Sequence, residues 1–344
     1  MLKSLKFVSL FLTVIVIVFA TGCEQDDSVT PEVVINSLEP DEIFPGDQVN
    51  VQGSNFNEVL FVFLERDQIP FQLDGDVITF AIPSSTSIGQ KIMTLVMPDG
   101  YIVTSDINLV ARPYPIIKAL STSAAQEGEE VTITGTSLDN LQSVSIGDVE
   151  ATVVSSTASE LKITVPSGLE QNIPVSIKVV TNGGEVTSPG TFYVGENLLL
   201  NGNIESGDGD EFTNWSKFNG GDGMTATTNE SEAYFGRSLR AVGAGGDAWR
   251  TQFASDLANT EIGVEYTLSM WIKAQPGTPG VGGNVRFSTN PNALYSGNYD
   301  ITSEWQQIEW VFTANAAQTR AVLDLGVVTD AVYYIDNITL IATD

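Results

Sequence analysis

Residues 46–56 and 128–138 are two copies of one pattern, and this internal repeat constrains the fold more than any other feature of the sequence. The two segments read GDQVNVQGSNF and GEEVTITGTSL and lie roughly 82 residues apart. This interval is too long for a solenoid unit and suits a small domain. We therefore expect two similar domains, over residues 31–111 (domain 1) and 113–194 (domain 2).

Each copy alternates apolar and polar residues, as a half-buried β-strand does. In the second copy, Val131, Ile133 and Gly135 fall on one face, while Thr132 and Thr134 fall on the other. Further matches keep the spacing and add turn signals: 82–84 (IPS) with 165–167 (VPS), and Asp99-Gly100 with Asn182-Gly183. Short strands with regular turns predict an all-β chain with one sandwich in each copy.

The repeated pattern resembles the IPT/TIG immunoglobulin-like domain, which implies a small β-sandwich for each copy. The joint at 112–115 (RPYP) favours a stiff connection, because proline fixes its own φ and extends the residue before it. Neither copy gathers polar groups suited to chemistry. We expect both domains to be spacers, with a protein-docking surface as the alternative.

A different composition begins near residue 196 and continues to residue 344 (domain 3). All five tryptophans of the chain lie in this part of the sequence: Trp215, Trp249, Trp271, Trp305 and Trp310. Apolar and polar residues alternate within the segments 266–273, 285–288, 307–312 and 322–327. Strands of this kind over such a length predict a jelly-roll sandwich.

Five segments of domain 3 resemble, in order, carbohydrate-binding modules of the family 4/9/22 group. They are 197–207 (NLLLNGNIESG), 234–241 (YFGRSLRA), 266–274 (YTLSMWIKA), 305–313 (WQQIEWVFT) and 334–340 (YIDNITL). Asn203, Ile204 and Asn337 depart from the family pattern, at positions that affect edges and packing. The resemblance implies a module that binds polysaccharide without catalysis.

The same resemblance implies a structural calcium ion between the first and last strands of domain 3. Matched to the family motifs, Glu205 and Asp336 would supply carboxylates, and a backbone carbonyl near Gly236 could contribute. Calcium prefers such oxygen ligands. The alternative is that Asp336 only caps a strand end and Glu205 is a surface charge.

Trp249 is the first candidate for contact with a sugar, because aromatic rings stack on the apolar faces of pyranoses. It follows a glycine-rich turn and has Arg250 and Gln252 beside it. We expect Trp249 to stack and Gln252 to bond hydroxyl groups. The alternative is that Trp249 packs in the core, because it has the same two-residue phase as Phe253.

Two further groups complete the candidate binding site. Arg286 and Asp324 are out of phase with the apolar residues of their strands, so they point away from the core, into a cleft or onto the opposite surface. Tyr295 and Tyr299 lie in a segment rich in tyrosine and asparagine that suits the rim of a cleft, and Tyr295 is the stronger candidate for stacking.

Composition excludes several classes of function. The formal net charge of −28 disfavours binding to nucleic acid, which needs clustered lysine and arginine. The chain has no histidine and one cysteine, which removes the Ser-His-Asp triad, an internal disulfide and cysteine-type zinc sites. No motif marks a nucleophile or a nucleotide loop, so we expect no enzyme.

The first 22 residues have the pattern of a signal peptide, with Lys3 and Lys6 before the apolar run 7–20. The segment 20–23 (ATGC) resembles a lipobox and implies a lipid on Cys23, with Ala20 where leucine is more usual. The acidic linker 23–30 contains Glu24 to Asp27, which resembles the export tag of surface lipoproteins, or is a solvated spacer.

Together these features predict a lipid-anchored surface protein of the outer membrane. Domains 1 and 2 would hold domain 3 away from the membrane, and domain 3 would bind a β-glycan, xylan first and β-glucan second. An outer-membrane glycan importer and a companion binding protein would be its partners. An adhesion or scaffold lipoprotein that binds proteins is the alternative, and a glycoside hydrolase is the least favoured reading.

Overall fold

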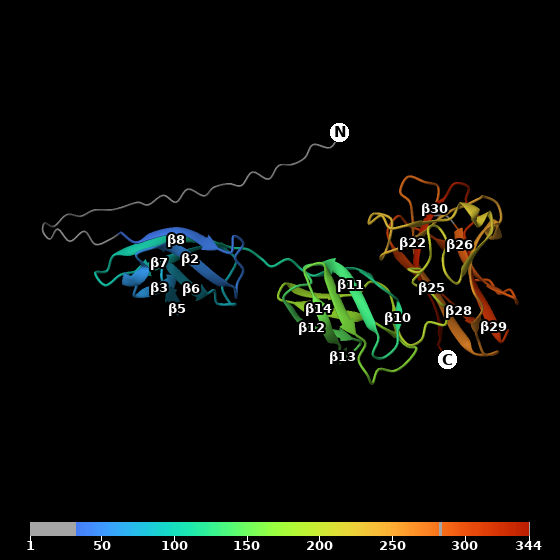
Figure 1. Ribbon diagram of the computed structural model, residues 1–344, viewed down its shortest axis with the longest axis horizontal. Coiled ribbons are helices and arrows are strands. Elements are labelled where there is room, and N and C mark those ends of the chain that lie inside the picture. The colour runs from blue at the N-terminus through green and yellow to red at the C-terminus, as the bar shows by residue number, and fades with distance from the viewer. Residues whose placement is uncertain (1–31, 282–283, 344) are drawn as a thin grey trace. The chain divides into compact units, whose positions relative to one another are not determined.

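The computed structural model describes residues 32–281 and 284–343, and its elements are strands with three short 3-10 turns. The predicted signal peptide, Cys23 and the acidic linker lie outside these residues. The chain divides into two compact units, residues 1–112 and 113–344. In the described ranges, no helix has the length and apolar character of a membrane span. The predicted all-β class is confirmed (Figure 1).

Domain 1 is a sandwich of two four-stranded antiparallel sheets. In strand order, the first sheet contains β1 (Val34–Glu39), β2 (Gln48–Ser54), β6 (Val77–Ala81) and β5 (Phe71–Asp74). The second sheet contains β4 (Asp67–Ile69), β3 (Phe61–Leu64), β7 (Gly89–Val96) and β8 (Ile102–Leu109). The turn η1 (Phe56–Glu58) follows β2. Its core lies between the sheets, where Val49 and Val51 of the repeated segment are fully buried.

Domain 2 repeats this plan and adds a small third sheet. In strand order, one of the two larger sheets contains β14 (Thr152–Ser156), β15 (Glu160–Thr164), β11 (Glu130–Thr136) and β9 (Ile116–Leu120). The other contains β13 (Val149–Glu150), β12 (Leu141–Ile146), β17 (Ile177–Thr181) and β18 (Gly184–Thr187). The third is β10 (Ala124–Ala125), β19 (Phe192–Val194), β16 (Pro174–Val175). Along β11, Val131, Ile133 and Gly135 are buried, which confirms the expected alternation.

The last glycine of the repeated pattern has the same structural role in both domains. A Cβ on Gly53 would lie 2.1 Å from the Val34 carbonyl oxygen, and one on Gly135 would lie 1.9 Å from that of Ile116. A register shift disturbs the pairing of the neighbouring strand in each case. The backbones approach too closely for any side chain, and this explains why glycine recurs.

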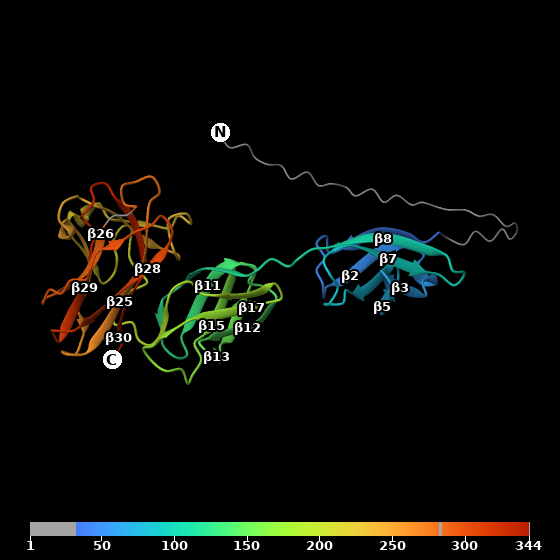
Figure 2. The ribbon, with the colours of Figure 1, turned by 180° about the vertical axis from the view of Figure 1, so that it is seen from behind.

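Domain 3 is a sandwich of two larger sheets, as the jelly-roll prediction requires (Figure 2). One contains β20 (Trp215–Asn219), β23 (Thr251–Ser255), β29 (Gln318–Asp324), β26 (Asn284–Asn290), β27 (Tyr299–Asp300) and β24 (Ala258–Asn259). The other contains β21 (Thr225–Thr227), β22 (Ser238–Val242), β30 (Val332–Ala342), β25 (Glu265–Ala274) and β28 (Gln306–Thr313). The turns η2 (Gly220–Gly223) and η3 (Ala248–Arg250) flank β20 and β23.

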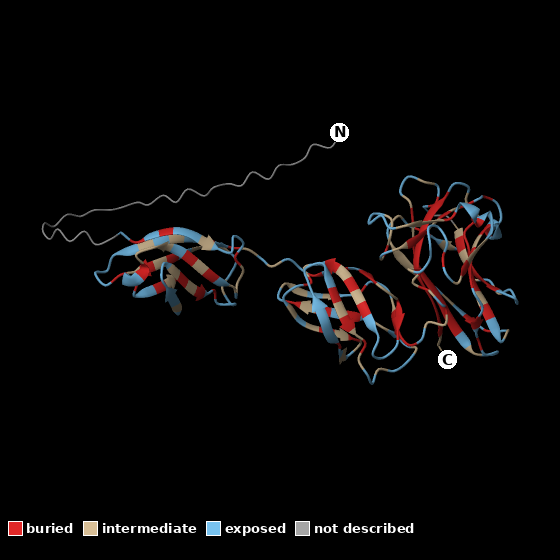
Figure 3. Cartoon of the chain, in the orientation of Figure 1, coloured by how far each residue is buried: buried red, intermediate tan, exposed pale blue. Residues whose placement is uncertain are grey.

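Strands β25 and β30 are buried on both faces, unlike the striped strands of domain 2 (Figure 3). Their inner residues line the core between the sheets, and Leu268, Met270 and Leu340 belong to it. Their outer residues meet domain 2. Trp271 packs with Ala119 and Tyr234, and Ile341 packs with Ala124 and Tyr193. Domain 2 therefore covers much of the outer face of β25 and β30 in the five-stranded sheet.

Hydrogen bonds join the same surfaces. The Asn337 side-chain amide donates to the Leu120 carbonyl over 2.7 Å, and the Trp271 indole donates to the Ser123 hydroxyl over 3.1 Å. The Gln307 amide bonds both backbone groups of Thr191, over 2.5 and 3.1 Å. Buried polar atoms paired in this way fix the relative orientation of domains 2 and 3.

We predict that Trp271→Ala destabilises domain 3 by about 3–5 kcal/mol, because a large buried side chain leaves a cavity. Urea unfolding followed by tryptophan fluorescence reports on this domain, since all five tryptophans lie there. The matched control is Trp249→Ala, which removes an exposed ring and should change stability by under about 0.5 kcal/mol. Equal losses in the two variants would contradict the packing described above.

Candidate functional site

A cleft of about 380 Å³ lies on the outer face of the six-stranded sheet of domain 3, the sheet opposite the one that domain 2 covers. Four strands and two neighbouring segments supply its lining. The lining residues are Phe218, Trp249, Gln252, Ala254, Arg286, Ser288, Thr289, Asn290, Ala293, Tyr295, Arg320, Val322 and Asp324. Rings, amides and charges thus meet on one surface.

Strand register places the central residues in one row. Phe218 on β20 stands opposite Gln252 on β23, and Gln252 stands opposite Asp324 on β29. Asp324 in turn stands opposite Arg286 on β26. Residues opposite one another in antiparallel strands point to the same face and touch. The row crosses four strands and forms the floor of the cleft.

Hydrogen bonds connect this row into a polar chain of Asn219, Gln252, Asp324 and Arg286. The Asn219 amide donates to Gln252 Oε1 over 2.8 Å, and Gln252 Nε2 donates to Asp324 Oδ1 over 2.6 Å. Arg286 Nε donates to Asp324 Oδ2 over 2.9 Å. Asp324 is fully buried, so its carboxylate acts from below as the acceptor that orients both neighbours.

Exposed aromatic rings accompany the polar chain. Trp249 is 46% exposed and Tyr295 is 59% exposed, which is unusual for such large rings. The Arg286 guanidinium lies over the Tyr295 ring, 4.6 Å from its centroid. Rings held beside oriented polar groups present both an apolar surface and hydrogen-bond donors to a ligand.

The structure brings together five of the seven residues predicted to bind ligand: Trp249, Gln252, Arg286, Tyr295 and Asp324. Trp249 does not pack in the core, although its phase matches that of Phe253. The 3-10 turn η3 interrupts the alternation before β23 begins at Thr251, so the Trp249 ring turns outward while Phe253 stays buried.

Arg250 and Tyr299 lie outside the cleft. Arg250 is exposed at the end of η3, with its guanidinium 5.8 Å from the centroid of the Trp249 ring. Tyr299 stands opposite Val285, a core residue, so it shares the core side of the sheet and not the cleft side. Its ring packs edge-on against Phe287, and its hydroxyl donates to the Glu309 carbonyl.

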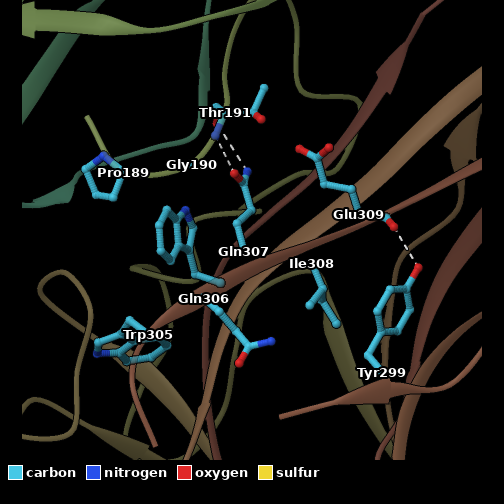
Figure 4. A pocket seen from close by; sticks show the side chains of 10 residues that line it. Pro189, Gly190, Thr191, Tyr299, Trp305, Gln306, Gln307, Ile308 and Glu309 are labelled. Carbon is cyan, nitrogen blue, oxygen red and sulfur yellow. Dashed lines mark hydrogen bonds between the residues drawn. The ribbon is translucent and has the colours of Figure 1, made fainter. Parts of the chain in front are cut away.

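Tyr299 instead lines a second hollow, of about 590 Å³, at the junction of domains 2 and 3 (Figure 4). Pro189, Gly190 and Thr191 border it from domain 2, and the start of β28 with Trp305 borders it from domain 3. The Gln307 side chain, which could face a ligand, is engaged with the Thr191 backbone (Figure 4). This junction hollow holds a structural contact.

Among the residues of the cleft and its support that the sequence analysis did not identify are Phe218, Asn219 and Arg320. Arg320 shares a strand face with Val322 and Asp324, so the out-of-phase pattern used for Asp324 could also have identified it. Asn219 has a positive φ of 54° at the end of β20, and only the tertiary structure brings it to Gln252.

The residues predicted to hold calcium lie around the turn that precedes β22. The backbone amide of Arg237 donates to Glu205 Oε1 over 3.0 Å, and those of Phe235 and Asn337 donate to the Asp336 carboxylate. Burial raises the pKa of the Asp336 carboxyl well above its usual range, opposed by its hydrogen bonds and reinforced by the charge of Glu205. Burial also raises the pKa of Glu205.

Gly236 completes this arrangement. It has a left-handed φ of 48°, and a Cβ there would lie 2.5 Å from Glu205 Oε2. The two carboxylates repel each other, and a side chain in place of Gly236 would fill the space beside them. Such an arrangement suits a hard cation. Within the described residues, no three acidic, histidine or cysteine side chains gather as a metal site would need, so backbone oxygens would have to complete the ligand set.

Two segments of the chain are similar to known protein families. Residues 115–194 match the family model of the IPT/TIG domain, and residues 196–330 match that of a carbohydrate binding domain. A curated relative, an IPT/TIG domain-containing protein of Bacteroides ovatus, is 30% identical over 178 residues. That match covers 46% of this chain and 36% of the relative, so the chain spans about a third of the relative's length.

Solved structures give more distant likenesses. SGBP-B from a complex xyloglucan utilization locus in Bacteroides uniformis is 17% identical, with a TM-score of 0.32 over 91% of this chain and 100% of that chain. The CBM22-1 xylan-binding domain from Paenibacillus barcinonensis Xyn10C is 15% identical, with a TM-score of 0.31 over 41% of this chain and 92% of that chain.

Proposed function

Residues 196–330 belong to a family of carbohydrate binding domains, and on that premise we propose that the cleft of domain 3 captures a polysaccharide at the cell surface. The predicted carbohydrate binding of domain 3 agrees with the family match, as does the expected non-catalytic function. Residues 115–194 are an IPT/TIG domain.

The observation that carries the proposal is an exposed Trp249 beside a polar row that is already oriented. Asp324 holds the Gln252 amide and the Arg286 guanidinium, so neither must be ordered when a ligand arrives. Preorganised groups lose less conformational entropy on binding. Trp249 and Tyr295 would stack on sugar faces, while Gln252 and Arg286 would bond hydroxyl groups.

As the ligand we propose a linear β-glycan, with xylan first and β-glucan second. The resemblance of domain 3 to modules of the family 4/9/22 group suggests this class. The cleft crosses four strands on a sheet face that domain 2 leaves open, so a chain could enter and leave at both ends.

A calcium ion bound by Glu205, Asp336 and backbone oxygens near Gly236 forms the second part of the proposal. The ion would neutralise the buried carboxylate of Asp336 and the half-buried carboxylate of Glu205, and would tie the start of domain 3 to its last long strand, β30. Its contribution would be structural, because these residues surround the turn before β22 and none of them lines the cleft.

The third part concerns location. The signal-peptide pattern and the lipobox-like segment before Cys23 support a lipid anchor. Several acyl chains hold a protein stably on a membrane, whereas one chain is marginal. The acidic segment Glu24 to Asp27 supports export to the outer face, with a glycan importer and a companion binder as partners. Domains 1 and 2 would serve as spacers.

We predict that the protein is retarded in affinity gels containing xylan or mixed-linkage glucan, and that Trp249→Ala weakens the affinity at least about tenfold, because a stacked ring is lost. Laminarin and mannan serve as further ligands. Tyr299→Phe is the matched control, since Tyr299 lies in the junction hollow, and it should bind normally. Failure of every glycan to retard the wild-type protein would exclude glycan binding. Normal binding by Trp249→Ala would exclude this cleft.

Calcium should raise the melting temperature of domain 3. A ligand at 100 times its Kd stabilises the native state by about 2.7 kcal/mol, which corresponds to roughly 5–10 °C for a domain of this size. EDTA should remove this increment and added calcium should restore it, whereas Asp336→Asn should abolish the response in both directions. Identical melting in EDTA and in calcium would count against the metal.

Cys23→Ala should release the protein from the membrane, because no acyl chains could then be attached. Fractionation of cells that express the full-length protein would show wild type in the outer-membrane fraction and Cys23→Ala in the soluble fraction. Added protease would then degrade wild type on intact cells if the anchor faces outward. A membrane-bound Cys23→Ala variant would contradict lipid anchoring at this residue.

A further inference from the structure

The cleft of domain 3 carries positive charge in an otherwise acidic protein. Three side chains of its lining are charged at neutral pH, Arg286, Arg320 and Asp324, although the chain as a whole has a formal net charge of −28. Asp324 is buried beneath the surface and pairs with Arg286. The second arginine therefore has no acid in the lining to balance it.

The Arg320 side chain has no carboxylate partner among the described residues, whereas Arg286 is partly engaged by Asp324. In the described part of the chain, the buried Nε of Arg320 also has no hydrogen-bond partner. Its guanidinium lies 5.6 Å from the centroid of the Phe218 ring, which holds the group at the cleft without neutralising it. Its terminal amino groups, which no carboxylate of the described residues pairs, are therefore the ones that favour an anionic acceptor in the cleft.

Arg286 also retains capacity for a ligand. Asp324 accepts a hydrogen bond from its Nε, and among residues 32–281 and 284–343 no partner engages its two terminal amino groups. Stacking over Tyr295 directs the plane of the guanidinium. Because the planar fork of arginine matches the two oxygens of a carboxylate, this geometry is suited to an oxyanion more than to a single hydroxyl group.

We propose that the cleft selects glycans that carry an anionic group, a uronic-acid carboxylate or a sulfate ester, with Arg320 and Arg286 as the residues that recognise it. This inference rests on the proposed function, because it names the class of glycan that the same cleft takes. Trp249 and Tyr295 contact the sugar rings, and the two arginines read the charge. Neutral glycans bind through the rings and through hydrogen bonds from their hydroxyl groups, and they bind more weakly.

The decisive comparison uses the wild-type protein and matched ligands in isothermal titration calorimetry. One pair is a xylo-oligosaccharide with a glucuronate branch and the same compound after carboxyl reduction. The second pair is a sulfated β-glucan oligosaccharide and its desulfated form. We expect the charged member of at least one pair to bind about tenfold more tightly, and the pair that shows the preference identifies the oxyanion.

Variants and salt test the assignment to the arginines. Arg320→Gln should remove the preference, so that the charged and the neutral member of a pair bind with similar affinity, and Arg320→Lys should keep part of the preference. Arg240→Gln is the control, because Arg240 lies on β22 of the other sheet and outside the cleft lining. Added salt should weaken binding of the charged member only, since it screens exposed charges.

Each failure has a distinct meaning. Equal affinity for both members of both pairs would overturn the inference and leave glycan binding intact. A preference that survives Arg320→Gln would overturn the role of Arg320. No binding of any of the four oligosaccharides would overturn the proposed function itself. The wild-type comparisons decide the selectivity even if Arg320→Gln does not fold.

Discussion

The position of the site depends on the junction between domains 2 and 3. Hydrogen bonds hold this junction together, from Asn337 to Leu120, from Trp271 to Ser123 and between Gln307 and Thr191. A sandwich has two outer faces, and each could in principle receive a ligand. Domain 2 covers much of that of the five-stranded sheet, where β25 and β30 are buried throughout most of their length. The outer face of the six-stranded sheet stays available.

Within that open face, one buried carboxylate organises the polar groups. Asp324 accepts from Gln252 and from Arg286, and Asn219 orients Gln252 from the other side. The desolvation of Asp324 is compensated because both of its oxygens have donors. The bond to Asp324 uses only Nε of Arg286, and the Tyr295 ring under the guanidinium orients its terminal nitrogens. The same few side chains therefore support the fold and would recognise the ligand.

Several properties of the molecule followed from the sequence alone because they depend on local periodicity. Two-residue alternation marked the strands, and the repeated pattern marked two similar domains, since a strand with one buried face must alternate. Arg286 and Asp324 could be assigned to an outer face by the same rule.

Other properties required the folded chain. Trp249 has the phase of a core residue, and only the 3-10 turn η3 rotates it outward. Tyr299 lies in a segment whose composition suits the rim of a cleft, yet it pairs with Val285 and therefore faces the core side of the sheet. Periodicity states which residues share a face of one strand, but neighbouring strands, turns and domains decide which face is covered. The alternation in β25 and β30 therefore could not reveal that domain 2 buries their outer residues.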